Sequence, residues 1–320
     1  MADKCVRFRI YLWDFQTILG ILICVVNYLI LIIFVLVCVA FVTLIEQKLL
    51  GGTQIRLGPS KVGFWGLLQP FSDAVKLFSK EYTFPRVRNN ILFLAIPFFS
   101  LFLILSLWIV FPSKFGGFSF SLGVLFFVCL RSLAVFPILA AGWSSNSKYP
   151  ILGGLRGVAQ IVSYEVSLLT ILLRLVWARN SLDFTEIKQN SGFNIGFFFP
   201  LIIIWFVSSL AETNRTPYDF SEGESELVSG FNTEYRAGGF TLIFIAEYAR
   251  IIFIGALFSI FFIYSINFLI FSFFCLFVVF LFVWVRSTLP RYRYDKLINL
   301  AWKRFLPISL IVLRYYICYI

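Results

Sequence analysis

Long apolar runs follow one another along almost the whole chain, and polar residues separate them only in loops. A helix of about 20 apolar residues crosses the hydrocarbon core of a bilayer, which is about 30 Å thick. Runs of about this length or more lie near 19–45, 91–111, 119–142, 151–177, 195–212, 238–263, 266–286 and 298–320. The sequence therefore predicts an all-α integral membrane protein with eight transmembrane helices.

Composition excludes the main alternatives to a helical membrane protein. Hydrophobic residues make up 60% of the chain and charged residues only 13%, so a soluble domain would lack the polar surface that it needs. A transmembrane β-barrel would show segments of about ten residues with alternating polarity, whereas these runs are continuous. We expect residues 1–320 to form a single membrane domain, in which residues 1–18 are an N-terminal extension.

The basic residues indicate the orientation of the chain. The net charge is +11, but the lysines and arginines are spread over loops rather than gathered on one stripe, so no nucleic-acid partner is expected. The loops after the odd-numbered helices contain most of these residues. By the positive-inside rule, these loops face the matrix or cytoplasm and both termini face the opposite side.

The chain contains no histidine, which removes the most common acid–base catalyst and a frequent ligand of metals and haem. Its six cysteines are scattered and form no Cys-x-x-Cys pair, so we interpret them as packing residues. No cofactor is expected to be bound by this chain. Any redox centre must therefore belong to a partner protein.

Two loops on the inner side are unusual. Residues 46–90 are basic and rich in glycine and proline, and apolar residues spaced three or four apart from Leu67 to Phe78 predict an amphipathic helix on the bilayer surface. Residues 212–237 interleave carboxylates with apolar side chains, and we expect a second surface helix there. An ordinary solvated acidic loop is the alternative.

Two carboxylates lie inside predicted membrane helices. Glu165 is in the fourth helix and Glu247 is in the sixth. A charged side chain at this depth costs a few kcal/mol or more, so it needs a partner, a watery cavity or a proton. Arg156 falls on the opposite helix face from Glu165, whereas Arg250 is close enough to pair with Glu247. Both acids are candidates for a proton relay, and a static ion pair is the alternative for each.

Further carboxylates crowd the acidic loop. They are Glu212, Asp219, Glu222, Glu224, Glu226 and Glu234. Like charges at such short spacing disfavour one another, so we expect several of these groups to titrate jointly. Such a cluster would hold or release protons when a nearby charge changes.

Arg131 and Arg174 lie deep in the third and fourth helices, and neither has a carboxylate near it in the sequence. The chain also has a single methionine. These observations lead to a hypothesis: the amino-acid sequence was derived from the gene with the wrong mitochondrial genetic code. It would then show arginine where the protein has another residue and isoleucine where the protein has methionine.

Several motifs closely resemble membrane subunit 1 of respiratory complex I, and the resemblance extends from about residue 30 to the C-terminus. The motifs are Glu46 to Glu81, Gly142 to Glu165, Ala211-Glu212-Thr213-Asn214-Arg215-Thr216-Pro217, Glu222-Gly223-Glu224-Ser225-Glu226-Leu227-Val228-Ser229-Gly230-Phe231-Asn232 and Leu289-Pro290-Arg291-Tyr292-Arg293-Tyr294-Asp295. The long glutamate motif is highly specific. Gln47 departs from the family, which usually has arginine at this position.

The resemblance implies a core subunit of NADH:ubiquinone oxidoreductase in the mitochondrial inner membrane, with the long odd-numbered loops in the matrix. Such a subunit forms the chamber that ubiquinone enters and couples quinone reduction to proton translocation. The residues that would line the quinone path are Arg56, Phe231 and Arg293. The residues that would form the proton-coupling path are Glu165, Glu212, Asp219, Glu222, Glu224, Glu226 and Glu247.

The resemblance also implies the partners. Other subunits of the complex would hold the FMN and the iron–sulfur clusters. The chain would contact the quinone-module subunits of the peripheral arm, neighbouring small membrane subunits, membrane lipids and ubiquinone. Two alternatives stay open: the anchor subunit of a related membrane-bound hydrogenase, and a stand-alone ion carrier, although the sequence shows no internal repeat of the kind that many carriers have.

Overall fold

The computed structural model describes residues 2–112, 120–189, 195–221, 223–263 and 267–319, and every regular element in them is helical. Within this part of the chain, six spans are long and apolar enough to cross a membrane. They are Leu22–Thr53, Asn90–Val110, Gly123–Ser144, Lys148–Arg179, Ala237–Phe262 and Leu269–Thr288. The prediction of an all-α membrane protein is confirmed. The fifth and eighth predicted spans coincide with α8 (Ile195–Glu212) and α13 (Leu306–Tyr319), whose described apolar segments are shorter.

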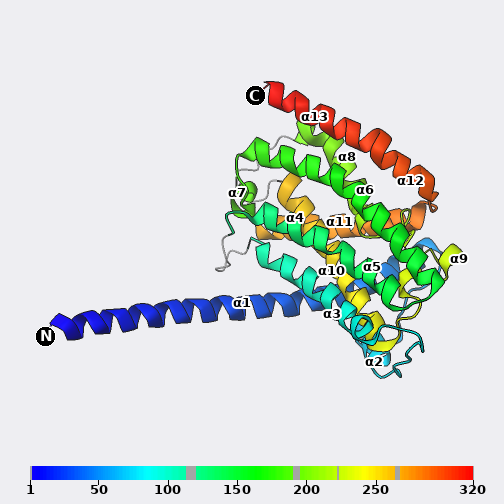
Figure 1. Cartoon of the computed structure of the whole chain (residues 1–320), viewed down its shortest axis with the longest axis horizontal. Coiled ribbons are helices and arrows are strands. Elements are labelled where there is room, and N and C mark those ends of the chain that lie inside the picture. Colours follow the sequence, from blue (N-terminus) through cyan, green and yellow to red (C-terminus); the bar gives the residue numbers. More distant parts are fainter. Residues whose placement is uncertain (1, 113–119, 190–194, 222, 264–266, 320) are drawn as a thin grey trace.

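The first helix, α1 (Ala2–Thr53), extends out of the bundle toward its N-terminus (Figure 1). Most of its apolar side chains between Leu22 and Phe34 are exposed, as is expected of a surface that faces lipid. Further along, Val35 and Val39 are buried in the main hydrophobic core. Only the C-terminal part of α1 therefore belongs to the core of the bundle.

The third predicted span is interrupted. It consists of α4 (Gly123–Leu133) and α5 (Val135–Ser144), which meet at Ala134. Pro137 accounts for the break, because it has no amide hydrogen for the carbonyl of Leu133 and its ring collides with that carbonyl. The position of this break therefore follows from a single residue of the sequence.

The most deeply buried helix is α10 (Ala237–Phe262), which packs against α1, α3 (Asn90–Leu107) and α11 (Phe268–Thr288). Another long helix, α6 (Lys148–Arg179), packs against α5, α8 and α13. The two carboxylates that the sequence places inside the membrane belong to α6 and α10. Both therefore lie within the helix bundle.

The two long loops lie at one end of the bundle, away from the N-terminal end of α1 (Figure 1). The first loop contains the short helix η1 (Phe64–Gly66) and α2 (Gln69–Phe78), which packs against α1 and α10. The acidic loop contains α9 (Glu224–Leu227) and η3 (Gly230–Asn232). A helix is therefore present in the first loop where the sequence predicts one, whereas the helices of the acidic loop are single turns.

Close backbone contact holds the acidic loop against α6. A side chain at position 153 would collide with the backbone of Gly230 and Phe231, so only glycine fits there. The side-chain amide of Gln160 donates two hydrogen bonds of 2.7 Å, to the backbone carbonyls of Ala211 and Tyr218. The position of the loop is therefore set by α6.

The C-terminal region runs back along the bundle as three connected helical elements. These are α12 (Tyr294–Leu300), the π-helical turn η4 (Ala301–Phe305) and α13. The π turn lies directly before Pro307, which cannot donate the hydrogen bond that a regular α-helix would need at this position. The eighth predicted span therefore contains an irregular turn.

Candidate functional site

One buried carboxylate joins four parts of the chain. The Oε1 atom of Glu46, in α1, accepts hydrogen bonds from Arg215 Nη1, at 3.1 Å, and from Arg286 Nη1 of α11. Its Oε2 atom accepts a hydrogen bond of 2.7 Å from the hydroxyl of Tyr248 in α10. This arrangement ties the start of the acidic loop to three helices, and we call it the Glu46 junction.

Arg215, the cation that the acidic loop contributes to the Glu46 junction, has a side chain that is only 13% exposed, and the side chain of Glu46 is 6% exposed. Burial disfavours the charged form of Arg215, but Tyr248 and Glu46 outweigh this and hold the pKa of the guanidinium above its usual value. Arg215 therefore stays charged, and so does Glu46 beside it. A buried pair of this kind is strongly destabilised when only one partner is removed.

A second charged group lies where α4, α6 and α8 meet. Arg131 Nε is 2.8 Å from Glu212 Oε1, and both side chains are buried. Glu165 interacts electrostatically with Arg131 and with Glu212. Two of the predicted acids are therefore brought together around one arginine, although they are 47 positions apart in the sequence.

Two further charged residues line a small cavity of about 30 Å³. Glu247, Arg250, Asn214 and Phe231 are among the residues that line it. Arg250 is half-buried and interacts electrostatically with Glu212 and Glu247, and Glu247 also interacts with Arg215. The buried Oδ1 atom of Asn214 has no hydrogen-bond partner among the described residues, and the cavity is large enough for one water molecule.

The other acids of the loop are separated from one another. Asp219 Oδ2 is 3.1 Å from Arg291 Nη2, and Glu226 Oε2 is 2.5 Å from Arg156 Nη1. Glu222 lies outside the described residues, as does the side chain of Glu224. Among the described acids, Glu165 and Glu212 thus share Arg131, and Glu212 and Glu247 share Arg250. Joint titration of several loop acids stays a prediction.

The three residues assigned to the quinone path by resemblance lie in different surroundings. Arg56 is exposed, and its side chain donates a hydrogen bond to Gln54. Arg293 is also exposed and forms an ion pair of 3.0 Å with Asp295. Phe231 is only 3% exposed and lines the small cavity between α3, α5 and α10. Among the described cavities, none is lined by more than one of these three residues.

Sequence reasoning missed Glu46 as a site residue. The sequence contained a signal for it. Glu46 is a carboxylate at the end of the first apolar run, just as Glu165 is a carboxylate within the fourth apolar run. Its partners Arg215 and Arg286 could not be assigned, because they follow it by 169 and 240 positions. Arg250 was noted only for Glu247, whereas its charge also acts on Glu212.

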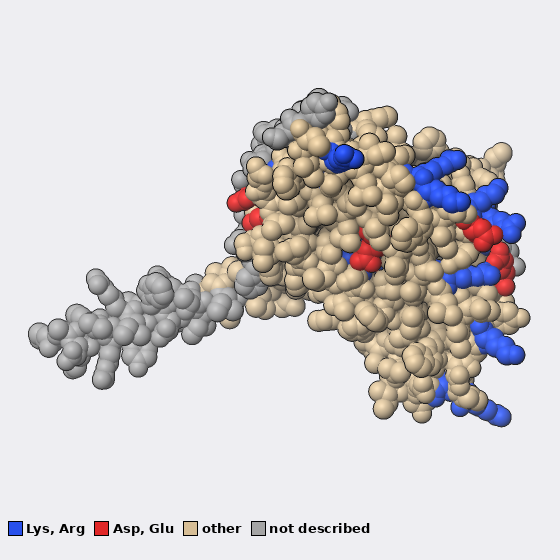
Figure 2. Space-filling view, turned by 45° about the horizontal axis from the view of Figure 1, so that its top comes forward, with Lys and Arg blue, Asp and Glu red and all other residues tan. Residues whose placement is uncertain are grey.

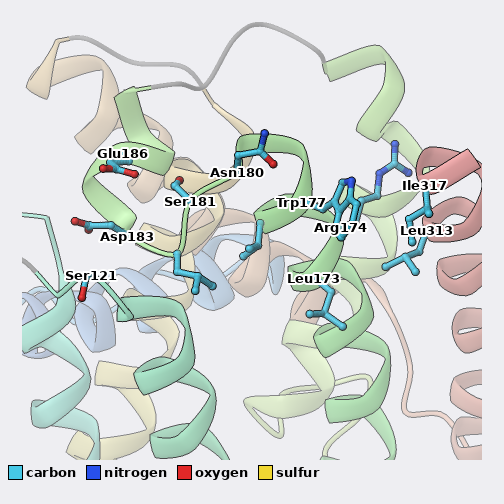
Figure 3. Close-up of a pocket in the computed structure, with 12 residues that line it drawn as sticks. Ser121, Leu173, Arg174, Trp177, Asn180, Ser181, Asp183, Glu186, Leu313 and Ile317 are labelled. Atoms are coloured by element: carbon cyan, nitrogen blue, oxygen red, sulfur yellow. The ribbon is translucent and has the colours of Figure 1, made fainter. Parts of the chain in front are cut away.

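The largest described cavity lies elsewhere, at the opposite end of the bundle. It has a volume of about 670 Å³, and residues of α6, α7 (Phe184–Gln189) and α13 line it, including Trp177, Asp183 and Glu186 (Figure 3). None of the predicted site residues lines this cavity. Among the described residues, no group of three or more cysteine or carboxylate side chains could hold a metal ion.

The genetic-code hypothesis is testable by peptide mass spectrometry of the purified chain. The structure gives Arg131 a partner, Glu212, and buries Arg174 in α6, where it lines the cavity of about 670 Å³ together with Asp183 and Glu186. The hypothesis predicts that trypsin does not cleave after position 174 and that the fragment masses at 131 and 174 differ from arginine. Arginine masses at both positions would remove the hypothesis.

Comparisons with known proteins agree with the resemblance seen in the motifs. Residues 26–317 match the model of the NADH dehydrogenase family. The chain is 56% identical over 299 residues to NADH-ubiquinone oxidoreductase chain 1 of Aedes aegypti, and the match covers 92% of this chain and 96% of that protein. Chain 1 of Locusta migratoria is 54% identical, over 92% of this chain and 94% of its own length.

A vertebrate relative extends this similarity. Chain 1 of Phascolarctos cinereus is 46% identical over 293 residues, which cover 88% of this chain and 92% of the relative. The family match, residues 26–317, spans both long loops and all the charged groups described above. The chain therefore belongs to the family of NADH-ubiquinone oxidoreductase chain 1, the membrane subunit 1 of mitochondrial respiratory complex I.

Proposed function

We propose that this chain forms part of the ubiquinone-access chamber of complex I and couples quinone reduction to proton translocation. A connected series of charged groups through the described helices supports the proposal. In order, the groups are Glu165, Arg131, Glu212, Arg250, Glu247, Arg215 and Glu46. Each member interacts electrostatically with the next, so a change at one end alters the protonation equilibria of its neighbours.

The proton transfer that we propose follows from the shared cations. Reduction of ubiquinone to ubiquinol takes up two electrons and two protons. When protein groups at the head of the chamber supply these protons, they keep the negative charge, which raises the proton affinity of nearby carboxylates. When Glu212 takes up a proton, Arg131 is no longer neutralised and attracts the negative charge of Glu165 more strongly. Glu165 then binds its own proton less tightly. The electrons themselves would come from FMN and iron–sulfur clusters in partner subunits.

We also propose an orientation and a number of spans. Figure 2 shows lysine and arginine side chains gathered at the end of the molecule opposite the N-terminal part of α1. The positive-inside rule assigns this end to the matrix side. With α8 and α13 counted as membrane helices beside the six longer spans, the chain crosses the inner membrane eight times, and α2 lies at the matrix surface.

Replacing Glu247 by glutamine tests the proposed coupling. The variant keeps the shape of the side chain but has no carboxylate that could take up a proton, so we expect a lower rate of quinone-linked NADH oxidation and of proton uptake in the assembled complex. NADH oxidation by an artificial electron acceptor should be unchanged, because that reaction uses only the partner subunits. Full quinone reduction with full proton pumping would contradict the proposal.

Arg56 tests the quinone path separately from the proton path. Its exposed guanidinium would contact the quinone head or the loop that guides it. We expect Arg56→Ala to raise the apparent KM for a short-chain ubiquinone several-fold and to leave kcat close to that of the unmodified complex. A change in kcat with an unaltered KM would argue against this role.

A further inference from the structure

The inner end of the bundle has a hollow of about 360 Å³ that the proposed function does not use. It lies along α12 and η4, and we call it the basic groove. The residues that line it are Tyr292, Lys296, Asn299, Leu300, Lys303 and Arg304. Three of them are cations, the hydroxyl of the tyrosine and the amide of the asparagine can donate hydrogen bonds, and none is a carboxylate.

The positive charge of the basic groove is not neutralised within the described part of the chain. No ion pair there joins Lys296, Lys303 or Arg304 to a carboxylate. Asp295, the acid next to the groove in the sequence, pairs instead with Arg293. Because three cations that share one hollow repel each other, a ligand that carries negative charge would stabilise them.

The surroundings of the basic groove are those of a membrane interface. The helix α12 begins at Tyr294, shortly after α11 ends at Thr288. Trp302, which neighbours the groove, is exposed, as is typical of aromatic residues at headgroup depth. Beyond the groove, α13 exposes Ile308 and Ile311. A cationic hollow is thus followed along the chain by an exposed apolar helix face.

We propose that the basic groove binds the phosphate headgroup of an anionic phospholipid, whose acyl chains lie along the exposed face of α13. The cations and the two hydrogen-bond donors match the oxygens of a phosphate diester. The neighbouring isoleucines match the acyl chains. An acidic segment of a partner protein would use the cations, but α13, which we count as a membrane helix, already places lipid acyl chains directly beside them.

Photo-crosslinking of the full chain in nanodiscs tests the lipid site. The discs contain phosphatidylcholine mixed with phosphatidylglycerol, and a trace of one of the two lipids carries a photoactivatable acyl chain. We expect phosphatidylglycerol to crosslink to α13 in preference to phosphatidylcholine. Lys296→Gln and Lys303→Gln should each lower this preference about fivefold, which corresponds to the ~1 kcal/mol that a cation near an anionic surface contributes.

Lys61→Gln provides the matched control, because Lys61 is an exposed lysine of the first loop and does not line the groove. High salt should lower the preference of the unmodified chain for phosphatidylglycerol. This measurement does not depend on whether a variant folds. If the acyl chains contribute to binding, an excess of inorganic phosphate should compete only weakly with the phospholipid. Full competition would identify the groove as a site for free phosphate and would overturn the proposal of a lipid site. Equal crosslinking of both lipids, or protection of these lysines by a partner subunit in the assembled complex, would also overturn it.

Discussion

Replacing Glu46 by glutamine should destabilise the folded chain by about 3–5 kcal/mol, the cost of removing one partner of a buried ion pair. Arg215 would then be a largely buried guanidinium without its carboxylate. One of the two carboxylate oxygens that now accept from Arg286 and Tyr248 would be replaced by an amide NH2, which cannot accept a hydrogen bond. Since this change is a large fraction of the stability of a typical domain, we expect little assembled complex. The measurement is the amount of complex on native gels, together with its melting temperature.

A second substitution separates the ion pair from general damage. Arg215→Gln alone should be as harmful as Glu46→Gln, but the double variant should recover part of the loss because neither buried charge is then left alone. Glu186→Gln is the control, since Glu186 is exposed on α7 and should change the stability by less than about 0.5 kcal/mol. Normal assembly of Glu46→Gln would show that the Glu46 junction does not hold the loop in place.

Glu165→Gln should lower quinone-linked turnover and proton translocation by roughly tenfold to a hundredfold, approaching the lower end of what a positioned proton-transfer group contributes. Glu165 is half-buried in α6, and its nearest charged neighbours are Arg131 and Glu212. A glutamine of the same shape keeps the packing but ends proton exchange at this position. The rates of NADH:ubiquinone reductase and of proton pumping are compared with the rate that an artificial acceptor supports, which should be unchanged.

The pair of variants Glu165→Gln and Glu212→Gln tests whether the two acids act as one unit. Because they share Arg131, the double variant should lose little more activity than the more damaging single variant. Losses that multiply would show that the two carboxylates act independently. Full proton pumping by the Glu165→Gln variant would show that these charged residues have only a structural role.

Much of the fold follows from the sequence because membrane insertion depends on local composition. The apolar runs gave the six long spans, and Pro137 gave the position of the break between α4 and α5. The helix in the first loop follows from the spacing of Phe71, Val75 and Phe78 along α2. The single-turn helices of the acidic loop could not be predicted, because their positions depend on contact with Gly153 and Gln160 of α6.

The sequence predicted some residues of the candidate site but not which of them are neighbours. Glu165, Glu212 and Glu247 stood out because carboxylates are rare among lipid-spanning residues. The neighbour relations among them were hidden, since Glu212 meets Arg131 from another helix and Glu46 meets residues of the loop and of α11. The expectation that the loop acids act as one cluster did not anticipate that Asp219 and Glu226 each have their own arginine.

The sequence by itself determined that this chain lies in a membrane and where its rare carboxylates are. Transfer of a helix from water into lipid is a sum of local contributions, which can be read along a single segment. Only the tertiary structure decided which cation faces each carboxylate. That choice depends on distances between side chains on helices far apart in the sequence, and in a medium of low dielectric constant a difference of a few ångströms separates a paired charge from an unpaired one.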